Sequence, residues 1–508
     1  MGFAYKTYPP MGHQRVALRR AWPGTEFGCF LEMGTGKTYV AITLAAARFA
    51  AGQIDRMLIV CPTPIKPVWE EELEKHCPVP YDLVILRAGD NPERWIKSGT
   101  TPDKLKVFVV GIESLSSGGE RTKGKNGKLG KLKTHTDAGS YGLAYRFISG
   151  GNCFVCIDES SRIKNYNSIR TKRVISLGGF SSYRMVLTGT PITQGLQDLY
   201  GQFEFLNSRI LRCRNFTVFR NRYCIMGGFG GKKVLGYQFQ DDLYDRVSPY
   251  IAQARTADCI DMPDQVYEKR QVEPTAQQKR AIIDIMKDFE STQGEKSLRT
   301  NTALERMTRY QQIIGGTFPY NVDDEAKPSF SWEPISGRNP KLDETMELLE
   351  DIPHDKKVLI FARFKPEVEY VKAAIIKAYG EASFTTYTGS TPERERSTNY
   401  KRFRQDPSCR FFITNQQVGG YGLDLVAAHY TLFYSNSFSY EDRKQSEFRT
   451  YRNGQTLPCI YFDIEMAIKH DKMILSAIAY KEDLATVSWN EIEKRVNALN
   501  PAYEKVAV

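Results

Sequence analysis

The chain reads Phe30-Leu31-Glu32-Met33-Gly34-Thr35-Gly36-Lys37-Thr38 at the point where an apolar run gives way to a helical pattern. Glycines in such a loop let backbone N–H groups turn toward a triphosphate, and the helix that follows points its positive end at the same charge. The closing lysine and threonine supply a cation and a hydroxyl group that binds Mg²⁺. The stretch therefore predicts a nucleotide-phosphate loop, with Leu31 where the strict motif has glycine. A glycine-rich turn that binds nothing is the alternative, which the rest of the chain has to decide.

Length and charge set the broad class of the protein. At 508 residues the chain exceeds the size at which one hydrophobic core keeps growing, so two or three domains are expected. A formal net charge of +11 favours a polyanionic partner, but only weakly, because many basic proteins bind no nucleic acid. No run approaches the roughly 18 apolar residues of a membrane span, and the first residues lack the apolar core of a secretion signal. We expect an intracellular protein of the cytoplasm or nucleoid, including a viral protein acting in its host's cytoplasm, with no membrane partner.

The ten cysteines are scattered singly, apart from Cys153 and Cys156 in an apolar run. A metal or redox role for this pair is one interpretation. The pattern favours reduced cysteines in a buried strand, because no second pair at ligand spacing exists and strand residues i and i+3 point to opposite faces.

Short apolar runs alternate with helical patterns in two parts of the chain, which predicts a parallel sheet covered on both faces in each part. The runs of the first part, residues 1–206, are 56–60, 83–86, 107–110, 154–157 and 185–187. The runs of the second part, residues 339–470, are 357–361, 384–387, 410–414 and 430–434.

The remaining segments lack this alternation. Residues 207–338 are rich in Arg, Tyr and Phe, carry a glycine-rich loop at 227–231, and predict helices near 276–291 and 304–314. We interpret this segment as helical insertions and a connector. The tail, residues 471–508, has helical periodicity. Its expected buried positions are Ile474, Ile478, Ile492, Val496 and Leu499.

Asp158-Glu159 follows the apolar run that ends at Ile157. An NTPase needs such an acidic pair opposite its phosphate loop. Asp158 would hold Mg²⁺ through water, and Glu159 would orient and deprotonate the attacking water. An acidic pair at a strand end is often only solvated, but here Ser160-Ser161-Arg162-Ile163-Lys164-Asn165 extends the pattern.

Eight segments, in order, resemble the motifs of Swi/Snf-type helicase-like ATPases of superfamily two. They are 32–38, 58–62 with 69–73, 158–165, 187–192, 358–362, 387–390, 418–425 and 445–455. The resemblance covers the chain from Gln14 to Gln455. It implies an α/β fold of two RecA-like parallel-sheet lobes in tandem, with helical insertions between them, and hydrolysis of ATP with Mg²⁺.

The resemblance also implies roles for individual residues. Catalytic roles fall to Lys37, Asp158, Glu159, Arg449 and Arg452, and Mg²⁺ is held by Thr38 and Asp158. Nucleotide contacts fall to Gln14, which would face adenine, and to Met33, Gly34, Thr35, Gly36, Lys37, Thr38, Gly422 and Asp424. For Gln14 the alternative is a surface residue, and for the two arginines it is pairing with local carboxylates. Arginine fingers that neutralise transition-state charge are worth roughly 10³–10⁵ in rate.

Nucleic-acid contacts are implied on loops that follow strands. They fall to Pro62, Thr63, Ser114, Thr388, Gly389, Ser390, Val418, Gly419 and Gly420, and coupling between sites falls to Thr188, Gly189, Thr190 and Gln445. Contacts to the phosphate backbone position a protein without reading sequence, so binding should be largely nonspecific and sensitive to salt. Residues 121–133 are basic and free of acids, which fits either a solvated loop or a further DNA clamp.

Four positions depart from the family pattern. Leu31 stands where the family has aspartate, Ser160-Ser161 replace the usual pair after the acidic residues, and Phe448 replaces an acid before the first finger arginine. The roles toward Mg²⁺ and water stay intact, while the link from nucleotide state to DNA could be altered.

The principal hypothesis is a monomeric ATP-driven translocase on double-stranded DNA, for fork regression, annealing, repair or recombination. A superfamily-two helicase that separates DNA or RNA strands is the alternative. A third hypothesis, of another class, is a nucleotide-gated DNA-binding scaffold that does not hydrolyse ATP.

Overall fold

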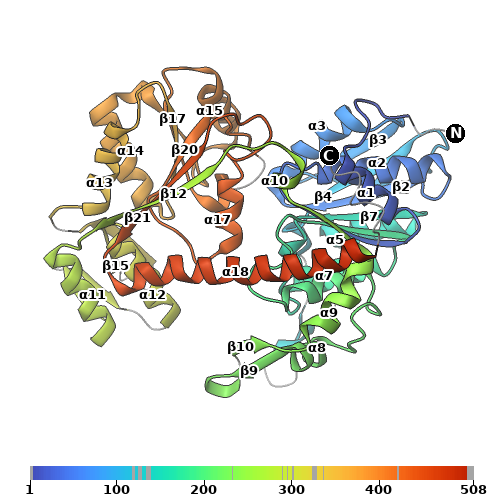
Figure 1. Cartoon of the computed structure of the whole chain (residues 1–508), viewed down its shortest axis with the longest axis horizontal. Helices are drawn as coiled ribbons and strands as arrows, with labels where there is room; N and C mark the ends of the chain where they lie inside the picture. The colour runs from blue at the N-terminus through green and yellow to red at the C-terminus, as the bar shows by residue number, and fades with distance from the viewer. Residues whose placement is uncertain are drawn as a thin grey trace. The chain divides into compact units, whose positions relative to one another are not determined.

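The computed structural model describes residues 4–116, 121–123, 129–132, 139–231, 233–288, 290–293, 296–299, 303–322, 329–335, 337–419 and 423–499. The chain divides into two compact units (Figure 1). Unit 1 comprises Met1–Asp261 and Lys481–Val508, and unit 2 comprises Met262–Tyr480.

Unit 1 is built on a seven-stranded sheet in which every pairing is parallel. In sheet order the strands are β11 (Ile251–Ala254), β1 (Glu26–Leu31), β8 (Tyr183–Leu187), β7 (Cys153–Asp158), β2 (Arg56–Cys61), β4 (Leu105–Gly111) and β3 (Tyr81–Ile85). Every residue of β2, β4 and β7 is buried, because helices cover both faces of a parallel sheet. The helices up to β8 are α1 (Gly12–Ala21), α2 (Lys37–Ala50), α3 (Lys66–His76), α4 (Glu93–Lys97), α5 (Gly139–Ser149) and α6 (Ile169–Gly178).

The chain after β8 adds helices and a hairpin to unit 1 before β11 returns to the sheet beside β1. These elements are α7 (Asp198–Leu206), α8 (Phe216–Tyr223), β9 (Cys224–Gly227), β10 (Lys233–Tyr237), α9 (Gln240–Val247) and, after β11, α10 (Thr256–Cys259). The basic segment 121–133 contains a small hairpin of β5 (Arg121–Lys123) and β6 (Leu129–Leu132), and the rest of it lies outside the described residues.

Unit 2 is built on a six-stranded parallel sheet. In sheet order the strands are β12 (Gln265–Val272), β21 (Cys459–Met466), β20 (Ala428–Phe433), β17 (Lys357–Phe361), β19 (Phe411–Thr414) and β18 (Phe384–Tyr387). The helices are α11 (Ala276–Asp288), α12 (Ala303–Ile314), α13 (Pro340–Asp351), α14 (Lys365–Tyr379), α15 (Glu393–Gln405), α16 (Gln416–Gly419) and α17 (Tyr440–Glu447). Two hairpins complete the unit, β13 (Glu290–Gln293) with β14 (Lys296–Arg299) and β15 (Thr317–Val322) with β16 (Ser329–Pro334). Two parallel-sheet halves with helices confirm the expected fold class.

Residues 207–338 differ from the expected insertions by contributing strands. Helices α11 and α12 lie where the sequence predicts them, but the same segment supplies β11 to one sheet and β12 to the other. Strand β11 has only four residues, and β12 is an edge strand with mostly exposed side chains. Neither therefore shows the continuous apolar run that marks a buried parallel strand.

The tail forms one long helix, α18 (Lys469–Ala498). Its first part belongs to unit 2, where Ile474 and Ile478 are buried, and its second part belongs to unit 1, where Ile492 and Val496 are buried. The expectation that Leu499 is buried is wrong, because it lies one residue beyond the helix and is 51 % exposed.

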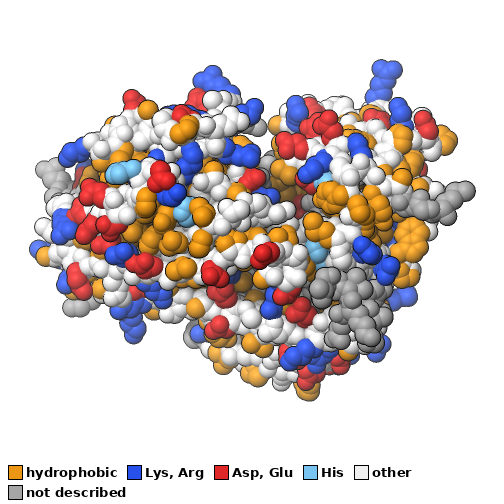
Figure 2. All heavy atoms as spheres, turned by 45° about the horizontal axis from the view of Figure 1, so that its top comes forward, with side chains coloured by type: hydrophobic (Ala, Val, Ile, Leu, Met, Phe, Trp, Pro, Cys, Tyr) orange, Lys and Arg blue, Asp and Glu red, His pale blue; other side chains and the backbone are white. Residues whose placement is uncertain are grey.

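The surface charges and the cysteines match an ordinary protein whose cysteines are reduced. On the face shown in Figure 2, Lys and Arg side chains are interspersed with Asp and Glu side chains instead of forming one continuous basic field. Cys153 and Cys156 are free and buried in β7, as the pattern favours. Among the described residues, no group of three or more Cys, His, Asp or Glu side chains could hold a metal ion. No described helix combines the length and apolar character needed to cross a membrane.

Six short 3-10 helices occur in the loops. They are η1 (Thr63–Ile65), η2 (Ser114–Ser116), η3 (Ser160–Ile163), η4 (Phe229–Gly231), η5 (Ser248–Tyr250) and η6 (Glu381–Ser383), within the described parts of the chain.

Candidate nucleotide site

The phosphate loop connects β1 to α2 at the carboxyl end of the unit 1 sheet. Gly34 and Gly36 have φ angles of +82° and +86°, a left-handed conformation that glycine adopts without strain. Lys37 starts α2, and its Nζ donates a hydrogen bond to the carbonyl of Glu32 at 3.1 Å, so the side chain folds back over the loop. The loop thus places its backbone N–H groups, the amino end of α2 and a lysine together, which is the arrangement that binds phosphate.

Gln14 lies directly against this loop. Its Nε2 donates to the carbonyl of Thr35 at 3.0 Å, its Oε1 accepts from the N–H of Met11, and the side chain is buried. A Cβ at Gly36 would come within 2.4 Å of Gln14 Nε2, so glycine is required for this close approach. The alternative of a surface glutamine is wrong.

His13 supports the same loop. Its Nε2 lies 2.8 Å from the carbonyl of Thr35, and because a carbonyl only accepts, this nitrogen carries the proton. Burial lowers the pKa of His13 below its usual value, which keeps the ring neutral. The sequence did not single out this residue.

The acidic pair stands at the end of β7. Asp158 Oδ2 accepts a hydrogen bond from the indole Nε1 of Trp69 at 2.9 Å, and Oδ1 accepts from the N–H of Glu159 at 2.9 Å. Glu159 has a φ angle of +48°, unusual for a residue with a Cβ, which turns the chain sharply after the strand. Both carboxylates are buried.

Asp158 and Thr38 fit the donor set that Mg²⁺ takes beside a triphosphate, which is usually one or two protein oxygens, with water and phosphate completing the sphere. Burial raises the pKa of Asp158, and the nearby charge of Lys37 and the hydrogen bond from Trp69 oppose that shift. A buried carboxylate of this kind needs positive charge to remain ionised. The residues therefore fit the ion.

The loop after β8 contacts both the phosphate loop and the acidic segment. A Cβ at Gly189 would lie 3.2 Å from the N–H nitrogen of Met33, so residues 188–190 pack directly on the phosphate loop. The N–H of Thr188 donates to the carbonyl of Cys29, and the N–H of Thr190 donates to Thr188 Oγ1.

Ser160, which departs from the family pattern, helps to connect the acidic segment with the loop after β8. Its hydroxyl donates to Gln202 Oε1 at 2.8 Å, and Gln202 Nε2 donates to the carbonyl of Pro191 at 2.8 Å. The substituted serine therefore joins the acidic segment to the loop that packs on the phosphate loop.

The two candidate finger arginines of unit 2 follow α17 and converge on one backbone carbonyl. Arg449 Nη1 and Arg452 Nη1 donate to the carbonyl oxygen of Leu423 at 3.1 and 3.2 Å, and Arg449 Nε donates to the carbonyl of Gln445. Arg449 is buried, and Arg452 is partly exposed with no carboxylate partner among the described residues. For Arg452, the alternative of pairing with a local carboxylate is therefore wrong.

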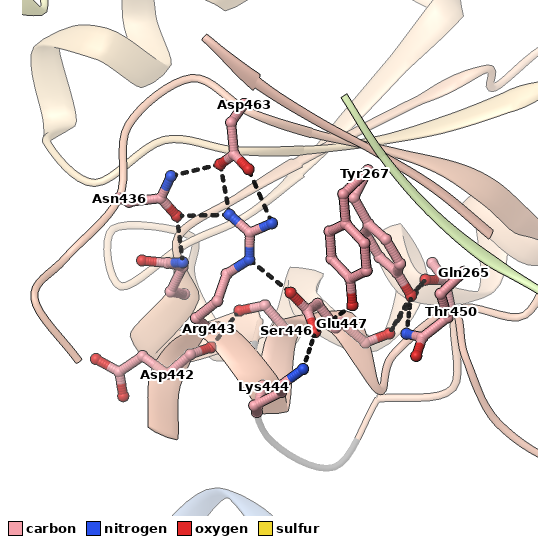
Figure 3. Close-up of polar contacts among 12 residues, drawn as sticks. Gln265, Tyr267, Asn436, Asp442, Arg443, Lys444, Ser446, Glu447, Thr450 and Asp463 are labelled. Atoms are coloured by element: carbon pink, nitrogen blue, oxygen red, sulfur yellow. Dashed lines mark hydrogen bonds and ion pairs between the residues drawn. The ribbon is translucent and has the colours of Figure 1, made fainter. Parts of the chain in front are cut away.

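A buried ionic network holds α17 in place (Figure 3). The Arg443 guanidinium, near the middle of the helix, donates to Asp463 Oδ2 at 3.0 Å, to Glu447 Oε1 at 2.7 Å and to Asn436 Oδ1 at 3.2 Å. The Tyr267 hydroxyl donates to Glu447 Oε2 at 3.1 Å. Burial would raise the pKa of Glu447, but the charges of Lys444 and Arg443 outweigh it and hold the pKa below its ordinary value. The network thus joins β12, β21, the segment that follows β20, and α17 just before the arginine pair.

Asp424 of the predicted nucleotide site follows Leu423, and Gln445, predicted to couple the sites, supplies the other carbonyl that accepts from Arg449. Asp424 Oδ1 accepts from the N–H of Val426, and Asp424 Oδ2 lies 3.8 Å from Arg404. The Gln445 side chain is buried, and neither its amide nitrogen nor its amide oxygen has a hydrogen-bond partner. Gly422 lies outside the described residues.

The predicted nucleic-acid loops lie at the carboxyl ends of strands. In unit 1, the N–H and hydroxyl of Thr63, after Pro62, donate to Glu113 Oε2 at 2.9 and 2.8 Å, and Ser114 Oγ donates to the carbonyl of Gly111. The predicted loops after β2 and β4 are therefore neighbours. The two Thr63 donors that we expect to face phosphate are bonded to Glu113 in this structure.

In unit 2 the corresponding loops follow β18 and β19. The hydroxyls of Thr388 and Ser390, on either side of Gly389, lie 3.0 Å apart. Val418 and Gly419 end α16, where a Cβ at Gly419 would come within 2.3 Å of Thr414 Oγ1. Gly420 lies outside the described residues.

A phosphate loop between β1 and α2, with an acidic pair at the end of β7, defines unit 1 as a nucleotide-binding α/β unit of the phosphate-loop class. The strand order and the single loop that carries lysine and threonine into α2 are the features that place it there.

Two family models match the chain, the SNF2-related domain over residues 20–315 and the helicase conserved C-terminal domain over residues 340–454. The chain belongs to the SNF2-related family of helicase-like ATPases. This bears out the resemblance drawn from the eight motifs.

Curated relatives are similar over most of the chain. Chromodomain-helicase-DNA-binding protein 1-like of Danio rerio is 24% identical over 444 residues, which cover 85% of this chain and 39% of that protein. DNA repair and recombination protein RDH54 of Saccharomyces cerevisiae is 23% identical over 521 residues, which cover 92% of this chain and 50% of that protein. The chain thus spans about half the length, or less, of these relatives.

Among solved structures, the chain is similar to the SWI2/SNF2 ATPase core of Sulfolobus solfataricus in complex with dsDNA. The two are 19% identical, the match covers 96% of this chain and 97% of that chain, and the TM-score is 0.39.

Proposed function

We propose that the chain is a DNA-dependent ATPase that uses ATP and Mg²⁺ to translocate on double-stranded DNA. The observation that carries the proposal is the unit 1 site, where a lysine-bearing phosphate loop stands with a buried acidic pair in a member of the SNF2-related family. The relatives' names, which include a helicase-DNA-binding protein and a DNA repair and recombination protein, support DNA as the partner.

The family resemblance and the chemistry of the side chains together give each site residue a role. The phosphate loop and Lys37 bind the β- and γ-phosphates, and Gln14, fixed against the loop, orients toward adenine. Glu159 positions and deprotonates the attacking water, since a carboxylate at this place is the general base that hydrolysis needs. Thr38 and Asp158 would hold Mg²⁺, which would supply positive charge beside the phosphates. Arg449 and Arg452 stabilise charge that develops in the transition state.

Nucleic acid would be held by backbone contacts from Pro62, Thr63 and Ser114 in unit 1 and from the loops at 388–390 and 418–420 in unit 2. Contacts to the phosphate backbone bind every DNA sequence equally, as a translocating protein requires.

The test is phosphate release by the full chain with duplex DNA, single-stranded DNA, single-stranded RNA or no nucleic acid. We expect duplex DNA to stimulate release most, and Glu159→Gln to abolish release while keeping nucleotide binding. A triplex-displacement assay on duplex DNA then measures translocation. Greater stimulation by single-stranded RNA would favour a strand-separating helicase, and nucleotide binding without any release by wild type would favour a scaffold.

A further inference from the structure

One region of unit 1 carries a concentrated positive charge that the nucleotide site does not use. Between Asn207 and Gln240 the chain has seven Lys and Arg residues and no Asp or Glu, although acids and bases are nearly balanced elsewhere. This region, here named the basic arm, contains α8 and the β9–β10 hairpin. In Figure 1 the hairpin extends from unit 1 beyond α8 and α9.

Four cations of the basic arm are available to a ligand. Arg209, Arg212, Arg214 and Lys233 are exposed, and none has a carboxylate within 4.0 Å in the described structure. Arg222 differs, because it pairs with Asp242 of α9 at 3.0 Å. Hydrogen bonds from Arg246 and then from Tyr223 help to lower the pKa of Asp242 to about 2, so Asp242 is ionised and bonded to Arg246 and Tyr223 as well as to Arg222.

The hairpin has the form of a free two-stranded ribbon. Among the described strands, β9 and β10 pair only with each other, and Ile225 and Leu235 on them are 46% and 59% exposed. The tip turns through Gly228 and Gly230, whose φ angles are +72° and +68°. A two-stranded β-ribbon has the width that the major groove of B-DNA admits.

The base of the ribbon is anchored, although an isolated hairpin is marginally stable in water. The Tyr237 hydroxyl at the end of β10 donates to Gln197 Oε1 at 3.0 Å, and a Cβ at Gly195 would come within 1.8 Å of the same hydroxyl. Gly195 and Gln197 belong to the segment between residues 188–190 and α7. The ribbon is therefore fixed to the segment that continues from the loop packed on the phosphate loop.

We propose that the basic arm is a further contact to duplex DNA. Arg209, Arg214 and Lys233 contact phosphates, and the exposed face of the ribbon lies in the major groove. We choose DNA as the partner because of charge complementarity. A segment with seven cations and no acid favours a polyanionic ligand. The inference rests on the proposed function, since it adds a second grip to the same substrate.

The test compares two variants with equal change in charge. Arg209→Gln/Arg214→Gln/Lys233→Gln removes three of the four exposed cations of the basic arm that have no carboxylate partner. Lys75→Gln/Lys97→Gln/Lys104→Gln removes three exposed lysines on or beside α3, α4 and β4 of the same unit. For each protein the slope of log affinity against log salt is measured with duplex DNA and with single-stranded DNA of the same length.

We expect the basic-arm variant to lower the magnitude of the duplex slope by about 0.9 for each phosphate that is no longer neutralised, about 2.7 for three, and the control variant to leave it unchanged. The single-strand slope should change less, because a single strand has no groove. A basic-arm slope equal to that of the control, or an equal decrease on both nucleic acids, would overturn the inference.

The experiment distinguishes failure of this inference from failure of the proposed function. Wild-type stimulation by duplex DNA is measured first, and its absence contradicts the proposed function. Stimulated wild type with an unchanged basic-arm slope contradicts only the inference. If the triple variant does not fold, Lys233→Gln alone, on the exposed ribbon, should still lower the slope by about 0.9.

Discussion

The phosphate loop of unit 1 and the arginine segment of unit 2 are held in place by different means. Lys37 bonds the carbonyl of Glu32 five residues away, and Gln14 bonds a carbonyl of the loop itself. Arg449 and Arg452 follow a helix whose position depends on Asp463 and on Tyr267, which lies 180 residues before Glu447. The first site is built from local backbone geometry, and the second is built from a buried ionic network between distant strands.

This difference predicts that the two sites fail differently when they are changed. A variant of the local site should lose nucleotide binding, whereas a variant of the network should keep nucleotide binding and lose turnover or stability. The following changes test that contrast.

Arg452→Ala should have the largest effect. The side chain is partly exposed, so its removal deletes a charge without opening the core. We expect kcat for phosphate release to fall by about 10³ and the affinity for a fluorescent ATP analogue to change little. Lys37→Ala is the matched change in unit 1 and should abolish nucleotide binding itself. A decrease below tenfold for Arg452→Ala would mean that it is not a finger.

Asp463→Asn removes one charge from the buried network. Breaking a buried ion pair leaves the partner charge uncompensated and lowers the free energy of unfolding by about 3–5 kcal/mol. Because Arg443 keeps its contact with Glu447, we expect a loss of about 3 kcal/mol. We expect a lower urea midpoint, measured by a unit 2 fluorescence signal, with a lower kcat and an unchanged KM.

The control for this change is Asp343→Asn, whose partner Arg338 is 75% exposed at its side chain. Exposed pairs contribute about 0–1 kcal/mol, so its urea midpoint should stay near that of wild type. Equal midpoints for the two variants would show that the network does not stabilise unit 2.

The same contrast explains what the sequence could predict. Residues that face a ligand lie in compact motifs, so Lys37, Asp158 and the loop glycines are recognisable from spacing and residue type. The contacts that support them are not recognisable in this way. Trp69 belongs to the motif segment 69–73, but its contact with Asp158 spans 89 positions, and Asp463 contacts Arg443 of α17 from β21. A hydrogen bond between distant residues leaves no periodic or local signal, and a four-residue strand such as β11 leaves none either.

The stability of unit 2 should also depend on pH. Glu367 of α14 is buried, and burial raises its pKa from 4.5 to about 7. The folded chain therefore holds a proton that the unfolded chain has released, so this contribution is full below about pH 4.5 and is lost as pH rises toward 7. The stability of unit 2 should fall over this range with a slope of at most about 1.4 kcal/mol per pH unit.

Glu367→Gln should flatten this slope, because glutamine does not titrate. Urea midpoints at pH 5 and pH 7.5 measure the effect. Glu369→Gln on the same helix changes an exposed carboxylate and should preserve the wild-type difference between the two pH values. A wild-type midpoint that rises from pH 5 to 7.5 with no change in Glu367→Gln would show that other groups control the dependence.

Trp69→Phe should have the smallest effect, and it tests the support of the acidic pair in unit 1. The substitution keeps an aromatic ring in α3 but removes the indole donor that holds Asp158 Oδ2. A hydrogen bond to a charged group contributes about 1.5–3 kcal/mol, and water replaces part of it, so we expect about tenfold weaker binding of an ATP analogue in the presence of Mg²⁺. Binding in the presence of EDTA should be unchanged, because the indole bond acts through the metal-binding carboxylate. Trp95→Phe removes a matching indole bond, to Asp82 at 2.6 Å outside the site, and should affect neither measurement. Equal weakening with and without Mg²⁺ would mean that Trp69 only packs α3, and the local site would then depend on its own backbone alone.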